Sequence, residues 1–428
     1  MHRPLRIQFI VTSLPVGGAE VLLLNLVRSM DHLNFRPEVV CLKEPGAMSD
    51  EFMEHVPLHS HLIGSKWDIS VVWRLRKLFL QQKADAVITV GAGDKMFWGR
   101  LAAKLAGVPV ICSALHSTGW PDGVGKLNRL LTGMTTGFIA VAAQHAEHLI
   151  KHERFPEDRV FTIPNGVDTN RFAPQPGAAR WLCDHLQIPS GTPLVGIVAA
   201  LRPEKNHQQF VQAAKQVLLQ HPTAHFIIVG DGPQRQDIQA AIQATGHAEH
   251  FHMLGNRSDT PQILSALDVF CLTSRNEANP VSILEALSCG VPVVSPDVGS
   301  ISETVLPNRT GFLTKPLCPK ETAQAIHKLL SDRDLACRLG VYGRQMVQSS
   351  WSLQSMVEGY QSLVQSLYNQ HLLRLGQPAW QRHQCPTYCL NHSDCCTDLE
   401  NQLESTLPII PTVTLASSPI ATVQSVHA

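Results

Sequence analysis

The sequence predicts an α/β fold with two doubly wound domains, each a parallel sheet covered by helices on both faces. Three observations lead to this fold class. The chain has 428 residues, more than one hydrophobic core usually holds. Short runs of Val, Ile and Ala alternate with helical patterns, which is typical of parallel strands buried on both faces. A segment rich in Pro, Gly and Ala interrupts the alternation near residues 168–190, and the alternation then starts again.

The first round of alternation opens with a strand signal at residues 6–13, a glycine turn, and a helical pattern at residues 17–30. The same rhythm continues to the Pro/Gly/Ala-rich segment. The other strand signals of this half lie at residues 37–42, 84–90, 108–115, 137–143 and 159–166. We therefore predict an N-terminal Rossmann-like domain over residues 1–175.

The second round predicts a C-terminal Rossmann-like domain over residues 176–350. Its strand signals lie at residues 193–201, 225–230, 250–255, 269–274, 291–296 and 311–314. Apolar side chains at helical spacing then predict a last amphipathic helix over residues 351–372. From about residue 373 the pattern dissolves, so we expect residues 373–428 to form a poorly ordered tail that contains cysteines.

The composition excludes several classes of protein. Hydrophobic residues make up 44% and charged residues 16%, which fits a globular protein rather than a disordered one. Lys+Arg and Asp+Glu are both 35, so no overall charge points to nucleic acid. No run of about 18 uninterrupted apolar residues predicts a membrane span. Seven cysteines scattered through ordinary contexts indicate free thiols, and we expect a cytoplasmic location.

The first glycine turn, PVGGAE, is a candidate anion site. Gly17 and Gly18 follow the first predicted strand and open a helix, where backbone N–H groups and the helix dipole favour an anion. The spacing is not that of the G-x-G-x-x-G dinucleotide fingerprint. A tight turn from strand to helix explains the same glycines, so both interpretations stand at this point.

Two cations follow the first strand of the second domain, in the stretch PLVGIVAALRPEKNH. Arg202 and Lys205 lie on the loop at the carboxyl end of that strand, where open α/β sheets bind their ligands. Arg offers a fork of donors to phosphate, and Lys a mobile point charge. A solvated loop is the alternative interpretation.

Two glutamates in the stretch NEANPVSILEALSCG, Glu277 and Glu285, have seven residues between them. Glu277 lies on a loop, and Glu285 lies inside the helix that Pro280 begins. The backbone N–H groups of Val281 and Ser282 have no partner within that helix and can bind phosphate oxygens. Carboxylates next to an anion site are suited to accept hydrogen bonds from sugar hydroxyls. A capping glutamate and a helix-face glutamate are the simpler alternatives.

These stretches together resemble the retaining nucleotide-sugar glycosyltransferases of family 4. That family carries an E-x7-E element, which Glu277 and Glu285 match, and other landmarks occur in the same order along residues 5–370. The landmarks are PVGGAE, PNGVD, RPEKNH, VGDGPQR, HMLGNRSD, the stretch from SRNEANP to VGSISE, and TGFLT. The resemblance implies the GT-B fold, in which two Rossmann-like domains face a central cleft and the last helix crosses back to the first domain. It also implies that acceptor contacts come mainly from the first domain.

The resemblance also implies roles for individual residues. Arg202 and Lys205 would hold the donor's diphosphate, and Glu285 the ribose hydroxyls. Glu277 would contact the transferred sugar, and Gly17 and Gly18 would approach the donor phosphates from the first domain. The amides of Val281 and Ser282 would share in the phosphate site. His116 occupies the position of a histidine that such enzymes keep near the sugar. Ala278 stands where many relatives have glycine.

The charge on the leaving diphosphate must be stabilised during sugar transfer, and either cationic side chains or a metal ion can do this. The sequence has one Asp-x-Asp pair, Asp332 and Asp334, which we interpret as capping and surface residues. We therefore expect no metal and no cofactor, with a nucleoside diphosphate sugar as the donor substrate. The resemblance then implies transfer with retention to a glycan or lipid-linked acceptor, in polysaccharide, lipopolysaccharide or glycolipid synthesis.

Three further groups invite a functional interpretation. His55, His59 and His61 suggest a metal site, but Pro57 breaks the helix that would align them, and we favour a polar loop. Six residues of the tail suggest zinc ligands, at a spacing that matches no familiar finger, and we favour a disordered tail. They are His383, Cys385, Cys389, His392, Cys395 and Cys396. Residues 66–80 predict either an ordinary helix with a basic outer face or a peripheral contact with anionic lipid at the cytoplasmic face of a membrane.

Two other functions remain as alternatives. A nucleotide-sugar 2-epimerase shares the architecture but needs additional acid/base carboxylates, for which the sequence offers no candidate. A non-catalytic sugar-nucleotide binder would not need the complete set of Glu277, Glu285, Arg202 and Lys205. We therefore expect a transferase.

Overall fold

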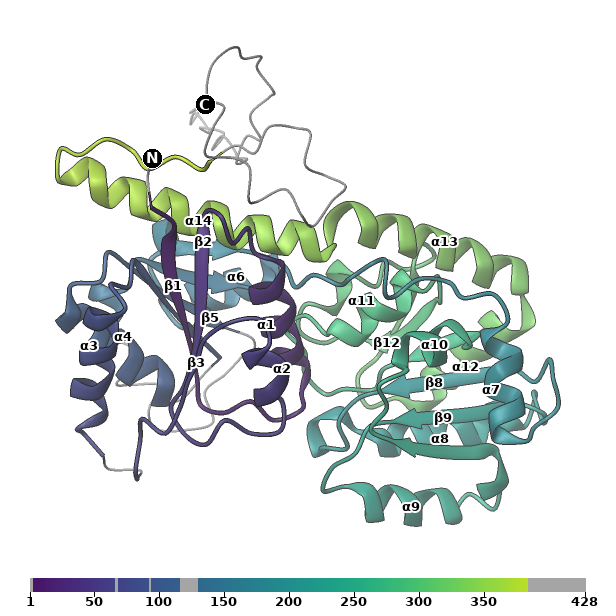
Figure 1. Cartoon of the computed structure of the whole chain (residues 1–428). Helices are drawn as coiled ribbons and strands as arrows, with labels where there is room; N and C mark the ends of the chain where they lie inside the picture. Colours follow the sequence, from purple (N-terminus) through teal and green to yellow (C-terminus); the bar gives the residue numbers. More distant parts are fainter. Residues whose placement is uncertain (1–2, 66–67, 92–93, 116–129, 384–428) are drawn as a thin grey trace, which may run out of the picture. The chain divides into compact units, whose positions relative to one another are not determined.

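The computed structural model describes residues 3–65, 68–91, 94–115 and 130–383, and one compact unit spans Met1–Arg382. This unit contains a seven-stranded sheet and a six-stranded sheet, and every strand pair in both is parallel. Along the chain, the strands of both sheets alternate with helices (Figure 1). The predicted α/β fold class with two parallel sheets is confirmed.

The first sheet has the strand order β3-β2-β1-β4-β5-β6-β7. Its strands are β1 (Leu5–Val11), β2 (Phe35–Cys41), β3 (Leu58–His59), β4 (Ala86–Val90), β5 (Val110–Leu115), β6 (Gly137–Ala140) and β7 (Val160–Thr162). The α-helices between them are α1 (Gly18–Ser29), α2 (Ser49–Met53), α3 (Val71–Gln81), α4 (Asp94–Ala106) and α6 (Ala143–Lys151). The described residues of this part also contain the 3-10 turns η1 (Thr132–Met134) and η2 (Glu157–Arg159).

The second sheet has the order β10-β9-β8-β11-β12-β13. Its strands are β8 (Leu194–Val198), β9 (His225–Val229), β10 (Phe251–Gly255), β11 (Val269–Cys271), β12 (Val293–Pro296) and β13 (Gly311–Thr314). Its helices are α7 (Ala178–Leu186), α8 (His207–Leu218), α9 (Arg235–Gln243), α10 (Thr260–Ser265), α11 (Val281–Ser288), α12 (Pro319–Ser331) and α13 (Arg333–Ser350). Its 3-10 turns are η3 (Pro203–Lys205), η4 (Ala248–His250) and η5 (Ile301–Glu303). The change of sheet falls between β7 and β8, and the predicted boundary after residue 175 lies in that interval.

Strand β1 shows why the apolar runs are continuous rather than alternating. Successive side chains of a strand point to opposite faces. Phe9 belongs to the core cluster that contains α1, whereas the next residue, Ile10, belongs to the cluster built from α3 and α4. Both faces of the first sheet are covered, so apolar residues are favoured at both kinds of position, and the buried Gln8 of the same strand is paired with Glu38 of β2.

The last helix, α14 (Leu353–Arg374), follows the second sheet in sequence but packs against the first sheet. Its residues Tyr360 and Val364 lie in the core cluster that includes Phe9, and Gln361 accepts a hydrogen bond from the backbone N–H of Asp31. The chain enters this helix through a short parallel bridge between Val167 of the PNGVD stretch and Ser352.

Order continues beyond the last helix, which corrects part of the expected tail. Trp380 is buried, and its ring centroid lies 5.5 Å from that of Phe35. Its indole N–H donates a hydrogen bond to the carbonyl of Arg3. Arg382 forms an ion pair with Glu358 of α14. The sequence pattern misses this segment because one buried tryptophan gives no periodicity. Residues 384–428 lie outside the described residues, together with the tail's cysteines.

Two further expectations concern membranes and thiols. Among the helices of the described ranges, none is both long and apolar enough to cross a bilayer. The seven cysteines before the tail are free thiols, and five of them are buried, as expected from their apolar contexts. The buried ones are Cys41, Cys112, Cys183, Cys271 and Cys289.

Candidate active site

The candidate site lies at the carboxyl ends of β8 and β11. Strand β8 is hydrogen-bonded to β9 on one side and to β11 on the other, so the chain reverses its direction of travel across the sheet at β8. Such a switch point leaves a space between two diverging loops, and open α/β sheets bind ligands there. Arg202 and Lys205 follow β8, and Glu277 follows β11.

The loop after β8 is fixed in place by the loop after β11. Thr273 Oγ1 donates to the backbone carbonyls of Lys205 and Asn206, at 3.2 and 3.1 Å. The N–H of Arg275 donates to the carbonyl of Glu204 at 2.8 Å. Because Lys205 closes the short turn η3, these bonds determine where its side chain leaves the backbone.

Two glycines of the VGDGPQR stretch support the same loop from the other side. Gly230 and Gly232 have φ values of +132° and +157°. A Cβ at Gly230 would lie 2.1 Å from the carbonyl oxygen of Ala199, and one at Gly232 would lie 2.7 Å from that of Leu201. The loop after β9 therefore packs directly on the backbone that leads to Arg202, and only glycine allows this approach.

The structure brings two predicted site residues together as an ion pair. Lys205 Nζ donates to Glu277 Oε1 at 2.5 Å, with 25% of the Lys205 side chain and 10% of the Glu277 side chain exposed. An ammonium group has three donors and a carboxylate two acceptor oxygens. The pair therefore keeps donor and acceptor capacity for a ligand.

Arg202 is placed differently from Lys205. Its guanidinium lies 4.0 Å from Glu204, and 59% of its side chain is exposed. An exposed ion pair at that distance contributes little to stability. Arg202 is therefore free to reorient toward a ligand at low energetic cost.

Sequence analysis missed Gly299, which positions the backbone of Glu277. Gly299 has a φ of +56°, and a Cβ there would lie 1.7 Å from the Glu277 carbonyl oxygen. The same oxygen accepts a hydrogen bond from the N–H of Ser300 at 3.1 Å. The only signal in the sequence was a glycine shortly after a buried strand, in VPVVSPDVGS, which is common in loops.

Sequence analysis also missed Asn279, which connects the Glu277 loop to the first sheet. Its side-chain amide donates to the carbonyl of Val141, after β6, at 2.9 Å. Its backbone carbonyl accepts from the side chain of Asn165 at 2.8 Å, and both asparagines are buried. The PNGVD and NEANP stretches therefore meet in the fold.

Helix α11 carries the other residues of this domain that are predicted to bind the donor substrate. It begins at Val281, directly after Pro280, so the first N–H groups, those of Val281 and Ser282, have no partner within the helix. Val281 also packs against the core cluster of the first sheet.

Glu285 keeps partial exposure, yet loss of hydration raises the pKa of its carboxyl to about 7, and the charge of Arg171 opposes that shift. Among the described residues, no side-chain hydrogen bond joins the Glu285 carboxyl group to the protein, so its two oxygens are available to donors of a ligand.

Gly17 and Gly18 lie where β1 ends and α1 begins, at the switch point of the first sheet between β1 and β4. Gly17 is extended, with a φ of −165°. A Cβ at Gly17 would lie 2.5 Å from a carboxylate oxygen of Glu20, whereas one at Gly18 would meet no atom within 4 Å. In the described contacts, no hydrogen bond joins either glycine to Lys205 or Glu277. Their role toward phosphates stays a prediction.

The other candidates are placed as follows. His116 lies outside the described residues. Asp332 accepts a hydrogen bond from the N–H of Leu335 at the start of α13, which is the capping role expected for it. His59 Nε2 lies 3.2 Å from Glu38 Oε2. Among the described residues, His55 and His61 do not form a metal-binding group with His59. Within the described ranges, the histidine and acidic side chains that do gather belong to η4 instead.

Helix α3 packs as an ordinary helix of the first sheet. Phe79, an aromatic residue of the 66–80 segment, is buried in the core with Val72 and Leu75. Arg74 and Arg76 donate to the backbone carbonyls of Leu62 and Leu105, respectively. Trp73 remains exposed over 63% of its surface. Lys66 and Trp67, the first two residues of the predicted 66–80 segment, lie outside the described residues.

Two family models match the chain. The model described as Glycosyltransferase Family 4 matches residues 16–171, and the model described as Glycosyl transferases group 1 matches residues 184–346. The first match covers most of the first sheet, and the second contains Arg202, Lys205, Glu277 and Glu285.

Two curated relatives are more than a quarter identical to this chain over the aligned residues. An Escherichia coli UDP-Gal:alpha-D-GlcNAc-diphosphoundecaprenol alpha-1,3-galactosyltransferase is 28% identical over 328 residues, which are 73% of this chain and 84% of that relative. A Mycobacterium tuberculosis GDP-mannose-dependent alpha-(1-6)-phosphatidylinositol monomannoside mannosyltransferase is 27% identical over 292 residues, which are 65% of this chain and 75% of that relative.

Solved structures share the fold. A glycosyltransferase from Rickettsia africae superposes with a TM-score of 0.76 and 21% identity, covering 86% of this chain and 99% of that protein. The Anabaena protein HepE, solved in complex with UDP, gives a TM-score of 0.75 and 21% identity over 85% of this chain and 100% of that protein. These matches agree with the two sheets and the returning helix. The chain belongs to glycosyltransferase family 4 and has the GT-B fold.

Proposed function

We propose that this chain transfers a sugar from a nucleoside diphosphate sugar to an acceptor hydroxyl, with retention of anomeric configuration and without a metal ion. The observation that carries the proposal is the ion pair of Lys205 and Glu277 at the switch point of the second sheet. It combines a cation for phosphate with a carboxylate for sugar hydroxyls. The UDP named for HepE and the UDP-Gal and GDP-mannose named for the relatives are consistent with such a donor.

The proposed chemistry is stabilisation of the leaving diphosphate. As the bond between the sugar carbon and the phosphate oxygen breaks, negative charge grows on the diphosphate and the sugar becomes oxocarbenium-like. Lys205 has N–H groups left for the phosphates while it stays bonded to Glu277. Arg202 reorients from Glu204, and the amides of Val281 and Ser282 add the partial positive charge of a helix start.

The two glutamates have separate roles in this proposal. Glu277 is held by Lys205 and by the backbone contact with Gly299, and its second oxygen accepts hydrogen bonds from hydroxyls of the transferred sugar. Glu285 accepts hydrogen bonds from the ribose hydroxyls. Its environment disfavours the charged form, so hydrogen bonds from a bound ribose would lower its raised pKa.

The acceptor is proposed to be a glycan or a lipid-linked sugar bound mainly by the first sheet and its loops. The acceptors named for the two curated relatives are a diphosphoundecaprenol-linked sugar and a phosphatidylinositol mannoside. A cytoplasmic enzyme that uses such acceptors works at a membrane surface. The exposed Trp73 on α3 is the described residue best suited to a peripheral contact.

The proposal is tested in two steps. Thermal unfolding is first measured with a panel of UDP-, GDP- and ADP-sugars, and we expect one of them to raise the melting temperature. The selected donor is then incubated with and without lipid-linked acceptors, and the anomeric configuration of the product is read by NMR. Transfer with retention supports the proposal. Epimerised donor formed without any acceptor would instead support a 2-epimerase, and binding without any turnover a non-catalytic binder.

A further inference from the structure

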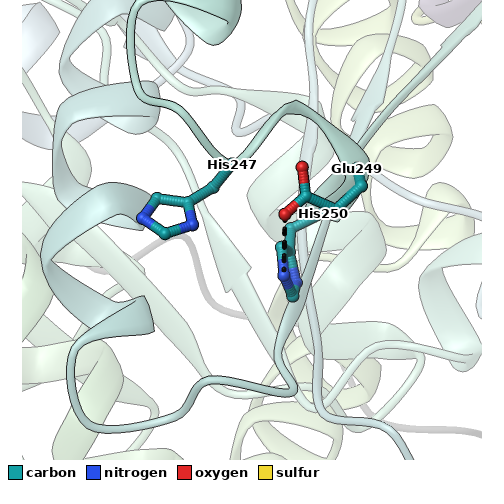
Figure 2. Close-up of side chains that lie close together, drawn as sticks. All are labelled: His247, Glu249 and His250. Atoms are coloured by element: carbon teal, nitrogen blue, oxygen red, sulfur yellow. Dashed lines mark ion pairs between the residues drawn. The ribbon is translucent and has the colours of Figure 1, made fainter.

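A second cluster of chemically active side chains lies away from the candidate active site, around the turn η4. His247 stands directly before this turn, and Glu249 and His250 lie within it. One ligand atom from each of the three side chains lies within 4.8 Å of the other two. Figure 2 shows them on one short stretch of chain, with the ion pair of Glu249 and His250 dashed.

The separation of the closest two atoms matches a metal site. His250 Nε2 is 3.5 Å from Glu249 Oε1. Ligands about 2.0 to 2.1 Å from a tetrahedral zinc ion lie about 3.4 Å from each other. The His247 ligand atom, within 4.8 Å of the other two, must approach by at most about 1.4 Å, which a side-chain rotation can supply. Glu249 is 69% exposed, so it too can reorient at little cost.

The imidazole of His250 is already oriented as a metal ligand. Its Nδ1 lies 3.0 Å from the carbonyl oxygen of Ala224, the residue before β9, and donates a hydrogen bond to it. In the neutral ring, this bond leaves the lone pair on Nε2, which faces Glu249. Histidine ligands commonly have such a partner on their other nitrogen, which fixes the tautomer and the ring plane.

One neighbouring histidine packs against that ring, and a second histidine is bonded to the first. The ring of His225 packs against that of His250, with centroids 4.9 Å apart. His225 Nδ1 is hydrogen-bonded to His252 Nε2 at 2.8 Å, so these two nitrogens already have a partner. His225 and His252 therefore serve as a supporting layer rather than as ligands.

We propose that His247, Glu249 and His250 bind a divalent transition-metal ion, with Zn²⁺ as the preferred physiological ion. Two imidazoles and a carboxylate suit this class of ion, whereas Ca²⁺ and Mg²⁺ prefer sites made of oxygen ligands. Water completes the coordination.

The position of the cluster gives the ion a structural role. The cluster adjoins the amino ends of β9 and β10, whereas Lys205 and Glu277 follow the carboxyl ends of β8 and β11. All these strands are parallel, so their amino ends lie on one side of the sheet and their carboxyl ends on the other. The two sites therefore lie at opposite ends of the strands. The ion would fix η4 beside the edge strand β10 without contacting the donor.

The experiment measures zinc bound to the full-length chain. The protein is treated with a chelator, dialysed against Zn²⁺, and its zinc content per chain is determined with the melting temperature. The wild type is compared with His247→Ala/His250→Ala and with Glu249→Gln. A matched control, His221→Ala/His327→Ala, removes another close histidine pair, whose ring nitrogens are 2.9 Å apart. His221 follows α8, and His327 lies on α12.

We expect the double variant to bind one zinc fewer than the wild type and to lose the zinc-dependent rise in melting temperature. Glu249→Gln changes a side chain that is 69% exposed and should weaken zinc affinity about tenfold. The control should behave as the wild type. Cysteines elsewhere can also bind zinc, so the comparison between proteins is the readout. Equal zinc content and equal affinity in the wild type, the double variant and Glu249→Gln would overturn the proposal.

Discussion

Lys205 and Glu277 form an ion pair of 2.5 Å between the loops that follow β8 and β11. These residues are 72 positions apart in the sequence and meet because β8 and β11 are adjacent in the sheet. The pair places a cation and a carboxylate where the two loops diverge.

Replacing Lys205 with Ala is expected to lower kcat/KM by about 100-fold and to weaken donor binding, because a donor to the diphosphate is lost. The Glu277 carboxylate also loses its partner, which should lower stability by about 1 kcal/mol. Steady-state kinetics and thermal unfolding measure both effects. Lys215→Ala, on the exposed face of α8, is the matched control.

The same pair predicts non-additive kinetics. If Lys205 and Glu277 act together, the variant Lys205→Ala/Glu277→Gln should lose less activity than the two single losses combined. Unchanged kinetics in Lys205→Ala, or strictly additive losses, would contradict the role given to the pair.

Replacing Glu285 with Gln is expected to stabilise the donor-free protein and to weaken donor binding. The pKa of Glu285 is raised to about 7 by burial, so the folded state binds more protons than the unfolded state between the two pKa values. Wild-type stability attributable to this group therefore falls as pH rises through that window. The stability gain in Glu285→Gln should grow by up to about 2.5 kcal/mol between about pH 5 and about pH 8. A gain that stays constant with pH in denaturant titrations would argue against a raised pKa.

Replacing Gly299 with Ala is expected to displace the Glu277 loop. The new Cβ would lie 1.7 Å from the Glu277 carbonyl oxygen, so the backbone must move. We expect kcat/KM to fall by more than about tenfold, since small misplacements of reacting groups are costly. Gly191→Ala is the control, because that glycine also has a positive φ, +84°, but has no atom within 4 Å of the added Cβ. Similar kinetics in the two variants would remove Gly299 from the account.

Replacing Trp73 with Ala is expected to reduce binding of the protein to vesicles that contain anionic lipid by several-fold, because an exposed aromatic ring inserts at the lipid interface. Co-sedimentation measures this effect. Leu219→Ala, at an exposed apolar residue after α8, is the control for loss of exposed apolar surface in general. If Trp73→Ala and the wild type sediment equally, α3 has no role at the membrane.

The sequence was sufficient to predict both parallel sheets because each buried strand needs apolar residues on both faces. Phe9 and Ile10, adjacent in β1, belong to two different core clusters, and both are apolar. The loop cations were predictable as well, since Arg202 and Lys205 directly follow a recognisable strand. The pairing of Lys205 with Glu277 was not, because it depends on which strands are neighbours.

The residues that sequence analysis missed act through backbone geometry or distant contacts. Gly299 matters because of its positive φ and its contact with Glu277, and a single glycine in a loop does not reveal either property. Asn279 bonds to Val141 and Asn165, which are far away in sequence. Phe79 carried no sign of its burial, since an aromatic residue on an amphipathic helix fits either a core or a membrane surface.

The central claim is that Lys205 and Arg202, with the first amides of α11, take the place of a metal ion at the donor diphosphate. The most direct test is the rate of sugar transfer by the full-length protein in EDTA, compared with the rate in added Mg²⁺ or Mn²⁺. His247→Ala/His250→Ala is measured in parallel, so that loss of an ion at η4 is not mistaken for an effect at the donor site. The account predicts equal rates with and without the chelator. Activity that disappears in EDTA and returns with Mg²⁺ or Mn²⁺ would contradict it.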